Sequence, residues 1–138
     1  MADLARLTVA ELLKLHSQIG DELRARGVLR SANSPTGDLA EHLFCRAFGW
    51  QQAPNSEKGF DATGPDGCRY QIKGRRVHKL NPSRQLSAIR NLEGNHFDVL
   101  AGVIFDDDFQ VSRAALIPRP VVVARAKYIQ HTNSHKFI

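Results

Sequence analysis

Two carboxylates, one amide and one lysine are the side chains of this sequence best suited to chemistry. Asp61 and Gln71 carry the carboxylate and amide oxygens that a hard divalent cation such as Mg²⁺ prefers, and the main-chain carbonyl of Ile72 could complete one side of the same site. Lys73 would stand beside the ion, where its charge stabilises a phosphate or helps to deprotonate a water. Glu41 would reach the site from a helix, as a further ligand or through a bound water. These residue types predict metal-assisted chemistry on a phosphate.

A hairpin over residues 59–73 must position three of these groups. The sequence of residues 64–67, Gly-Pro-Asp-Gly, suits a type I turn, with Gly67 free to take a positive φ and close the loop as a bulge. Counting outward from the turn, the expected cross-strand pairs are Thr63 with Arg69, Ala62 with Tyr70, and Asp61 with Gln71. Because side chains alternate along a strand, Lys73 then shares a face with both members of the last pair. The same geometry also allows a simpler outcome, in which Asp61 and Gln71 only hydrogen-bond to each other.

Two helices are expected before the hairpin. Residues 8–26 begin with a capping box, formed by Thr8 and Glu11, and apolar residues then recur at helical spacing. Residues 37–48 form a second amphipathic helix. At 3.6 residues per turn, Glu41 lies at the edge of the apolar stripe of this second helix. A carboxylate at that position lies where the helix meets the element on which it packs.

The remainder of the chain indicates strands separated by shorter helices. The expected elements are a helix over about 81–92, a buried central strand over 97–105, a second strand over 109–117 and a last helix over about 121–128. No long linker divides the chain, and 138 residues suit one domain. We therefore expect one mixed α/β domain over residues 1–138, with an N-terminal helix at about 8–26 and a core at about 36–128.

The positive charge of the chain is concentrated in and after the hairpin. The net charge is +5, and no acidic residue occurs between Asp66 and Glu93, a stretch that contains seven cations. Such a stretch creates a local field that attracts phosphate, although a solvated basic face would have the same composition. The candidate phosphate contacts are Lys58, Arg75, Arg76, Lys79, Arg84 and Arg90.

Several classes of protein do not fit the sequence. No apolar run approaches the roughly 20 residues that span a bilayer, and the first residues lack a secretory signal, so we expect an intracellular, cytoplasmic domain without a membrane segment. Cys45 and Cys68 cannot form a disulfide framework and do not have zinc-binding spacing. No glycine-rich phosphate loop of the Walker or dinucleotide kind is present, so no nucleotide cofactor is expected.

Together, the candidate residues resemble the PD-(D/E)XK nuclease superfamily, also called restriction-endonuclease-like. The matching pieces are Gly37-Asp38-Leu39-Ala40-Glu41, Gly59-Phe60-Asp61 and Tyr70-Gln71-Ile72-Lys73. The Gln-x-Lys form is similar to the Mrr-type branch, and the resemblance covers about residues 36–117. It implies an αβββαβ core, with a mixed sheet flanked by helices, to which this chain adds an N-terminal helix.

The resemblance also implies a function. The chain would be a hydrolase, a DNA endonuclease that depends on Mg²⁺ or Mn²⁺. Asp61, Gln71, the carbonyl of Ile72 and Glu41 would hold the metal and position the attacking water. Lys73 would stabilise the charge that develops on the phosphate.

Two departures from the family pattern keep alternatives open. No proline precedes Asp61, and Gln71 replaces the usual acid, which removes one negative charge and lowers the expected affinity for metal. Some members of the superfamily bind without cutting, so a catalytically inactive nucleic-acid-binding module is the main alternative. A protein-interaction domain with an incidental basic stretch is a third.

With no spare domain to read bases, specificity would come from loops, a partner subunit or a homodimer. The helix over 8–26 could either build a two-fold dimer or cover the sheet.

Overall fold

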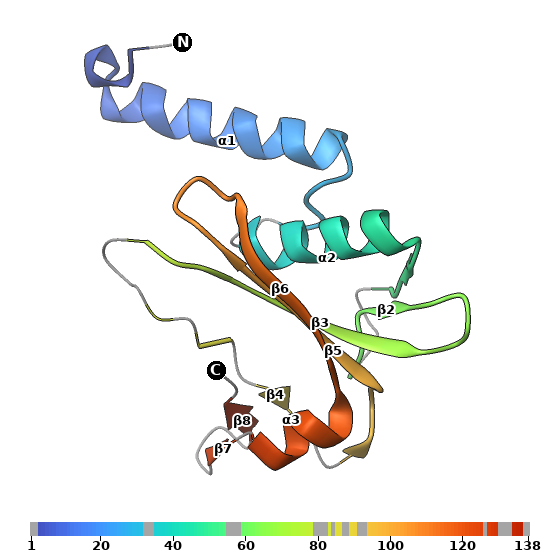
Figure 1. The fold of residues 1–138 in the computed structure, drawn as a ribbon. Helices are drawn as coiled ribbons and strands as arrows, with labels where there is room; N and C mark the ends of the chain where they lie inside the picture. Colours follow the sequence, from blue (N-terminus) through green and yellow to red (C-terminus); the bar gives the residue numbers. More distant parts are fainter. Residues whose placement is uncertain are drawn as a thin grey trace.

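The protein has an α/β fold with a five-stranded mixed sheet, seen in a computed structural model (Figure 1). The structure describes residues 3–31, 35–54, 59–78, 83, 85–86, 89–90, 94–125, 127–129 and 134–136. Its helices are η1 (Leu4–Arg6), α1 (Val9–Ala25), α2 (Pro35–Phe48) and α3 (Arg119–Arg125). Its strands are β1 (Gln51–Gln52), β2 (Ala62–Thr63), β3 (Arg69–Arg76), β4 (Ile89–Arg90), β5 (Val99–Phe105), β6 (Val111–Pro118), β7 (Lys127–Ile129) and β8 (Ser134–Lys136).

The strands of the central sheet lie in the order β1-β2-β3-β5-β6. Neighbouring strands are antiparallel except for β3 and β5, which run parallel with Tyr70 opposite Val99 and Arg76 opposite Phe105. A parallel pair needs a crossover connection, and the chain between β3 and β5 supplies it. A second sheet has the order β4-β8-β7 and lies beside α3 (Figure 1). The α/β class expected from the sequence is confirmed.

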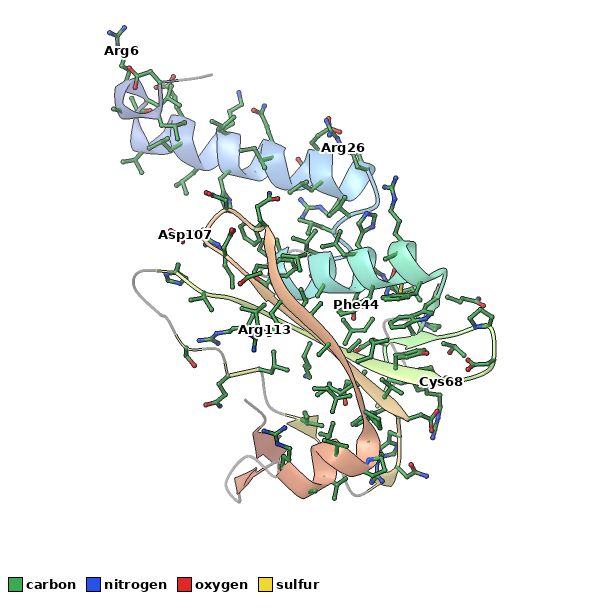
Figure 2. The ribbon with its side chains drawn as sticks, viewed as in Figure 1. Arg6, Arg26, Phe44, Cys68, Asp107 and Arg113 are labelled. Atoms are coloured by element: carbon green, nitrogen blue, oxygen red, sulfur yellow. The ribbon has the colours of Figure 1, made fainter. Side chains whose placement is uncertain are left out.

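Two hydrophobic clusters cover the two faces of the central sheet. On one face, Ala40 and Phe44 of α2 are buried in a cluster with Ile72, Val103 and Phe105 of the strands. Figure 2 shows Phe44 where α2 meets the sheet. The other cluster consists of Leu86, Ile89, Phe97, Leu100 and Val122. β5 contributes to both clusters because its side chains alternate between two covered faces, as expected for a central buried strand.

The hairpin formed by β2 and β3 has the predicted register next to its turn. The pairs are Ala62 with Tyr70 and Thr63 with Arg69, and Gly64 N donates to Cys68 O at 2.9 Å. Gly67 has a φ of +83°, which a residue with a side chain rarely adopts. The turn residues alone therefore determine which side chains of the two strands face each other near the loop.

α1 begins as predicted but lies apart from the core. Thr8 Oγ1 accepts a hydrogen bond from Glu11 N at 3.2 Å, and Glu11 Oε1 accepts one from Thr8 N at 2.9 Å, which completes the capping box. None of the residues of α1 is buried, and Figure 1 shows α1 on the far side of α2 from the sheet. α1 therefore does not cover the sheet.

No helix in the described part of the chain is both long and apolar enough to cross a membrane.

Two helices expected in the second half of the chain are corrected by the structure. Within 81–92, the described residues Ser83, Gln85 and Leu86 are irregular and Ile89–Arg90 is strand β4. Leu86 and Ile89 are buried and Ile89 pairs with β8, so packing and pairing outweigh helical spacing. The last helix starts at Arg119 rather than 121, because Pro120 suits a first turn, and it ends at Arg125, before β7.

Candidate functional site

Two carboxylates from different elements meet at the edge of the central sheet. Glu41 of α2 and Asp61, just before β2, lie close enough for their side chains to interact directly. Each has a second contact: Gln52 Nε2 donates to Glu41 Oε2 at 3.0 Å, and Asp61 Oδ2 accepts from the main-chain N of Ile72 at 2.7 Å. The sequence prediction that Glu41 and Asp61 share one site is consistent with this contact.

The electrostatics of this pair are unusual for surface carboxylates. Burial and, second to it, the charge of Asp61 together raise the pKa of Glu41 from 4.5 to about 7. The hydrogen bond from Gln52 and the charge of Arg30 oppose this shift but do not cancel it. Near neutral pH, Glu41 is therefore present in both its neutral and its charged form, next to a second carboxyl group.

The close approach of α2 to β3 explains why Glu41 reaches Asp61. A β-carbon placed on Gly74 of β3 would lie 2.9 Å from Ala40 Cβ and 3.3 Å from Thr36 O, so α2 rests directly on the backbone of the strand. Glu41 follows Ala40 in the helix. It therefore starts close to the strands, and its side chain reaches Asp61 just before the start of β2.

Asp61 does not pair with Gln71 as the sequence count predicts. Regular pairing ends at Ala62, and Asp61 N donates instead to Tyr70 O at 2.7 Å, one residue out of register. The carbonyl of Asp61 accepts from Ala53 N at 2.8 Å. This irregularity lets the Asp61 side chain turn toward Ile72 N, where a regular strand would have placed it across from Gln71.

The side chain of Gln71 has a buried amide oxygen that accepts no hydrogen bond from the described residues. Buried polar atoms are nearly always paired, so each exception requires a reason. Gln71 and Lys73 share the face of β3 opposite Ile72, which is buried against α2. Lys73 is half-buried on that face.

The oxygen atoms of these residues are of the kinds that a hard divalent cation takes. Glu41 and Asp61 supply carboxylate oxygens that lie next to each other. The carbonyl of Ile72 and the unpaired amide oxygen of Gln71 belong to the neighbouring strand β3, where Gln71 lies on the face away from α2. Among the described residues, no group of three or more His, Cys, Asp or Glu side chains gathers anywhere. Amide and main-chain oxygens would therefore have to complete the coordination.

The structure adds two residues that the sequence did not indicate. Gln52 holds one oxygen of Glu41, and Arg30 places a positive charge near it while Nη1 of Arg30 donates to Ala53 O at 3.2 Å. Gln52 belongs to a two-residue strand with no periodicity, and Arg30 lies in a loop, so neither carries a sequence signal. The stack of Trp50 on Tyr70, with ring centroids 3.6 Å apart, fixes β1 and so places Gln52.

Of the six candidate phosphate contacts, the structure describes the side chains of two. Arg75 Nε donates to Ser83 O at 3.2 Å. Arg76 donates through Nε to Asp107 O at 3.0 Å, and its guanidinium lies 4.5 Å above the ring of Phe109, so it is held by the turn between β5 and β6. Arg76 thus has a structural role that the basic stretch did not predict. Lys58, Lys79, Arg84 and the side chain of Arg90 lie outside the described part of the structure.

Comparison with known proteins gives no family for this chain. No protein-family model matches it, and no curated protein matches it. Its function must therefore be argued from the arrangement of its own residues.

Proposed function

We propose that this protein is a divalent-metal-dependent DNA endonuclease of the PD-(D/E)XK type. The observation that carries the proposal is the contact between Glu41 and Asp61 next to β3, whose residue Gln71 has a buried amide oxygen without a partner. Two carboxyl groups in contact and an unpaired buried oxygen each cost stability. A bound cation would neutralise the two carboxyl groups, and β3 would add the carbonyl of Ile72 and the amide oxygen of Gln71 as neutral ligands.

The order of the elements supports the same proposal. The chain has α2 first, followed by the antiparallel strands β1, β2 and β3, and then by β5, which is parallel to β3. This order is compatible with an αβββαβ core. The candidate residues lie on α2, before β2 and on β3, which are the elements that the resemblance assigns to them. The described part of the crossover contains no helix between β3 and β5, which departs from that core.

The roles of the residues follow from their positions. When bound, Mg²⁺ or Mn²⁺ would supply Lewis-acid activation of a water and of the scissile phosphate. Glu41, Asp61, Gln71 and the Ile72 carbonyl would hold the ion, and Ile72 N keeps one oxygen of Asp61 in place. Lys73 would stabilise the charge developing on the phosphate, and Arg75, two residues further along the same face of β3, would contact the flanking backbone.

Cleavage of supercoiled and linear DNA with Mg²⁺ or Mn²⁺ tests this proposal. We expect Asp61→Asn and Lys73→Ala each to lower the cleavage rate by about 100-fold or more, since each removes a charge that acts on the phosphate or the metal. Asp98→Asn is the matched control, because Asp98 pairs with Arg69 near the same sheet and should leave the rate within about threefold.

Two results would count against the nuclease. If cutting persists in both variants, the activity does not belong to this site. If the wild type binds DNA in a salt-sensitive manner but cuts with neither metal, the alternative of a catalytically inactive nucleic-acid-binding module replaces the proposal.

A further inference from the structure

α1 exposes an apolar face that the described residues of its own chain leave largely uncovered. The helix is amphipathic and 17 residues long, yet none of its residues is buried. Val9 is 74% exposed and Leu13 65% exposed, and Leu12 and Ile19 are also exposed. A helix of this kind normally gains its stability by packing its apolar face, so the exposed stripe calls for a partner.

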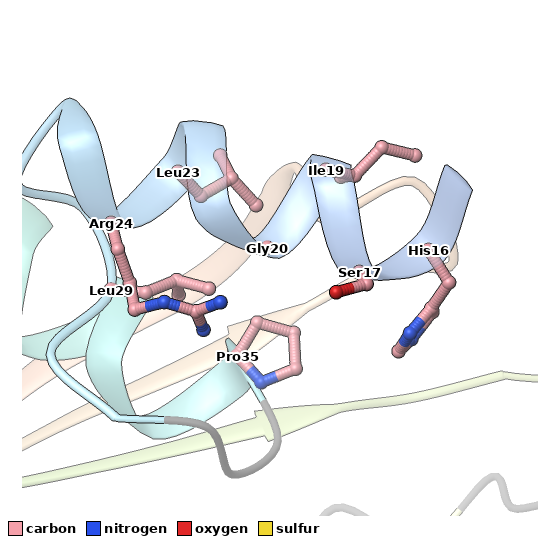
Figure 3. Close-up of a pocket in the computed structure, with 8 residues that line it drawn as sticks. All are labelled: His16, Ser17, Ile19, Gly20, Leu23, Arg24, Leu29 and Pro35. Atoms are coloured by element: carbon pink, nitrogen blue, oxygen red, sulfur yellow. The ribbon is translucent and has the colours of Figure 1, made fainter. Parts of the chain in front are cut away.

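The contact between α1 and its own chain is incomplete. A cavity of about 320 Å³ separates the second half of α1 from the start of α2, and Figure 3 shows Ile19, Leu23, Leu29 and Pro35 around it. Val9, Leu12 and Leu13 do not line this cavity. Among the described residues, the apolar side chains at the start of α1 therefore lie outside the contact between α1 and α2.

A second uncovered apolar surface lies between α2 and the edge strand β6. It forms a groove of about 160 Å³ that is lined by apolar side chains alone, among them Leu43, Ala47 and Phe48 of α2 and Val111 and Ala114 of β6. Phe48 and Val111 are each more than half exposed. No residue of α1 lines this groove, so the helix of the same chain does not fill it.

The size of the two surfaces matches what a dimer requires. From their exposed fractions, the large apolar side chains on α1 and around the groove offer on the order of 500 Å² per chain. A standard interface buries about 800 Å² per partner, of which somewhat more than half, or about 450 Å², is apolar. Because each chain carries both a helix and a groove, two copies related by one two-fold axis can each place the helix in the groove of the other.

We propose that the protein forms a homodimer in which α1 of each copy docks into the groove between α2 and β6 of the other. Val9, Leu12 and Leu13, which do not line the cavity within the chain, pack into the groove of the other copy, and both contacts form together in a closed dimer. The interface is separate from Glu41 and Asp61, so it does not depend on the nuclease proposal.

Light scattering after size exclusion tests the dimer with the full chain. We expect the wild type to have the mass of a dimer, and Leu13→Glu and Val111→Glu each to raise the dissociation constant at least about tenfold, because each places a charge in an apolar contact. Gln18→Glu adds the same charge on the polar face of α1 and should leave the mass unchanged. Circular dichroism verifies that each variant is folded.

Mixing the two variants distinguishes this arrangement from other dimers. Leu13→Glu keeps an intact groove and Val111→Glu keeps an intact helix, so an equimolar mixture contains one native contact per heterodimer and should regain mass. A monomeric wild type, a dimer insensitive to Leu13→Glu, or a mixture as dissociated as its separate components would each overturn the proposal.

Discussion

Two pairs of side chains next to β3 show opposite electrostatic designs. At the start of the strand, Arg69 and Asp98 form an ion pair, with Nη2 and Oδ1 3.2 Å apart, and Asp98 Oδ2 also accepts from Arg69 N at 2.8 Å. These contacts lower the pKa of Asp98. Just before the start of β2, Glu41 meets the carboxyl group of Asp61, and the pKa of Glu41 rises to about 7.

The Arg69–Asp98 pair stabilises the fold, whereas the Glu41–Asp61 pair costs it stability. The Arg69–Asp98 pair joins β3 to the residue before β5, and its charges neutralise each other within the chain. The Glu41–Asp61 pair is compensated only in part, by the hydrogen bond from Gln52 and the charge of Arg30. A like-charge pair that costs stability and is nevertheless present is typical of a functional site.

The largest effect should come from divalent metal. At pH 8 and a concentration 100 times the dissociation constant, a ligand that binds only the folded state raises the free energy of unfolding by about 2.7 kcal/mol. We expect Mg²⁺ or Mn²⁺ to raise the melting temperature of the wild type and not of Asp61→Asn. Asp98→Asn should respond like the wild type, and equal responses in all three proteins would assign the metal to another place.

Removing the like charge should stabilise the metal-free protein. Because the pKa of Glu41 is about 7 when folded against 4.5 normally, the folded state holds an extra proton between these values and stability falls as pH rises through this window. We expect Glu41→Gln in EDTA to gain about 1–2 kcal/mol at pH 8, after allowance for partial exposure, and almost nothing at pH 4.5. Urea unfolding at both pH values measures this, and a variant less stable than the wild type at pH 8 would contradict it.

The ion pair should give the smallest effect and the opposite pH dependence. Since Arg69 lowers the pKa of Asp98, the pair contributes stability above the normal pKa of 3.8 and loses it as pH falls through the lowered value. Asp98→Asn should lower the melting temperature by about 1–3 °C at pH 7, because exposed pairs are weak and asparagine still accepts from Arg69 N. The loss should vanish in strong acid. A loss that is unchanged there would mean that packing, not charge, connects these residues.

The features that the sequence predicts well are those decided by near neighbours. The capping box at Thr8 and Glu11 and the register of Ala62 with Tyr70 follow from four and nine consecutive residues, and both are confirmed. The buried strand β5 was evident because it is apolar on both faces. Glu41 was placed at the edge of the apolar stripe of α2, and the structure brings it to Asp61.

The features that the sequence did not predict depend on distant partners. Asp61 leaves the register because its main chain bonds to Ala53 and Tyr70, and no turn rule contains that information. Ile89 joins a strand because β8 lies beside it. Gln52 contacts Glu41 only because β1 is seated by aromatic stacking. In each case, tertiary contacts outweigh local preference.

The contact between Gly74 and Ala40 links two positions that lie far apart in the sequence. The φ of Gly74 is outside the left-handed region, so its lack of a side chain is required by the space beneath α2 and not by its backbone. Any methyl gained at position 74 must be matched by a loss at position 40, where only glycine is smaller than alanine. We therefore expect positions 40 and 74 to covary among homologous sequences. Otherwise a side chain at position 74 would push α2 away from β3. Glu41, the residue after Ala40, would then move away from Asp61.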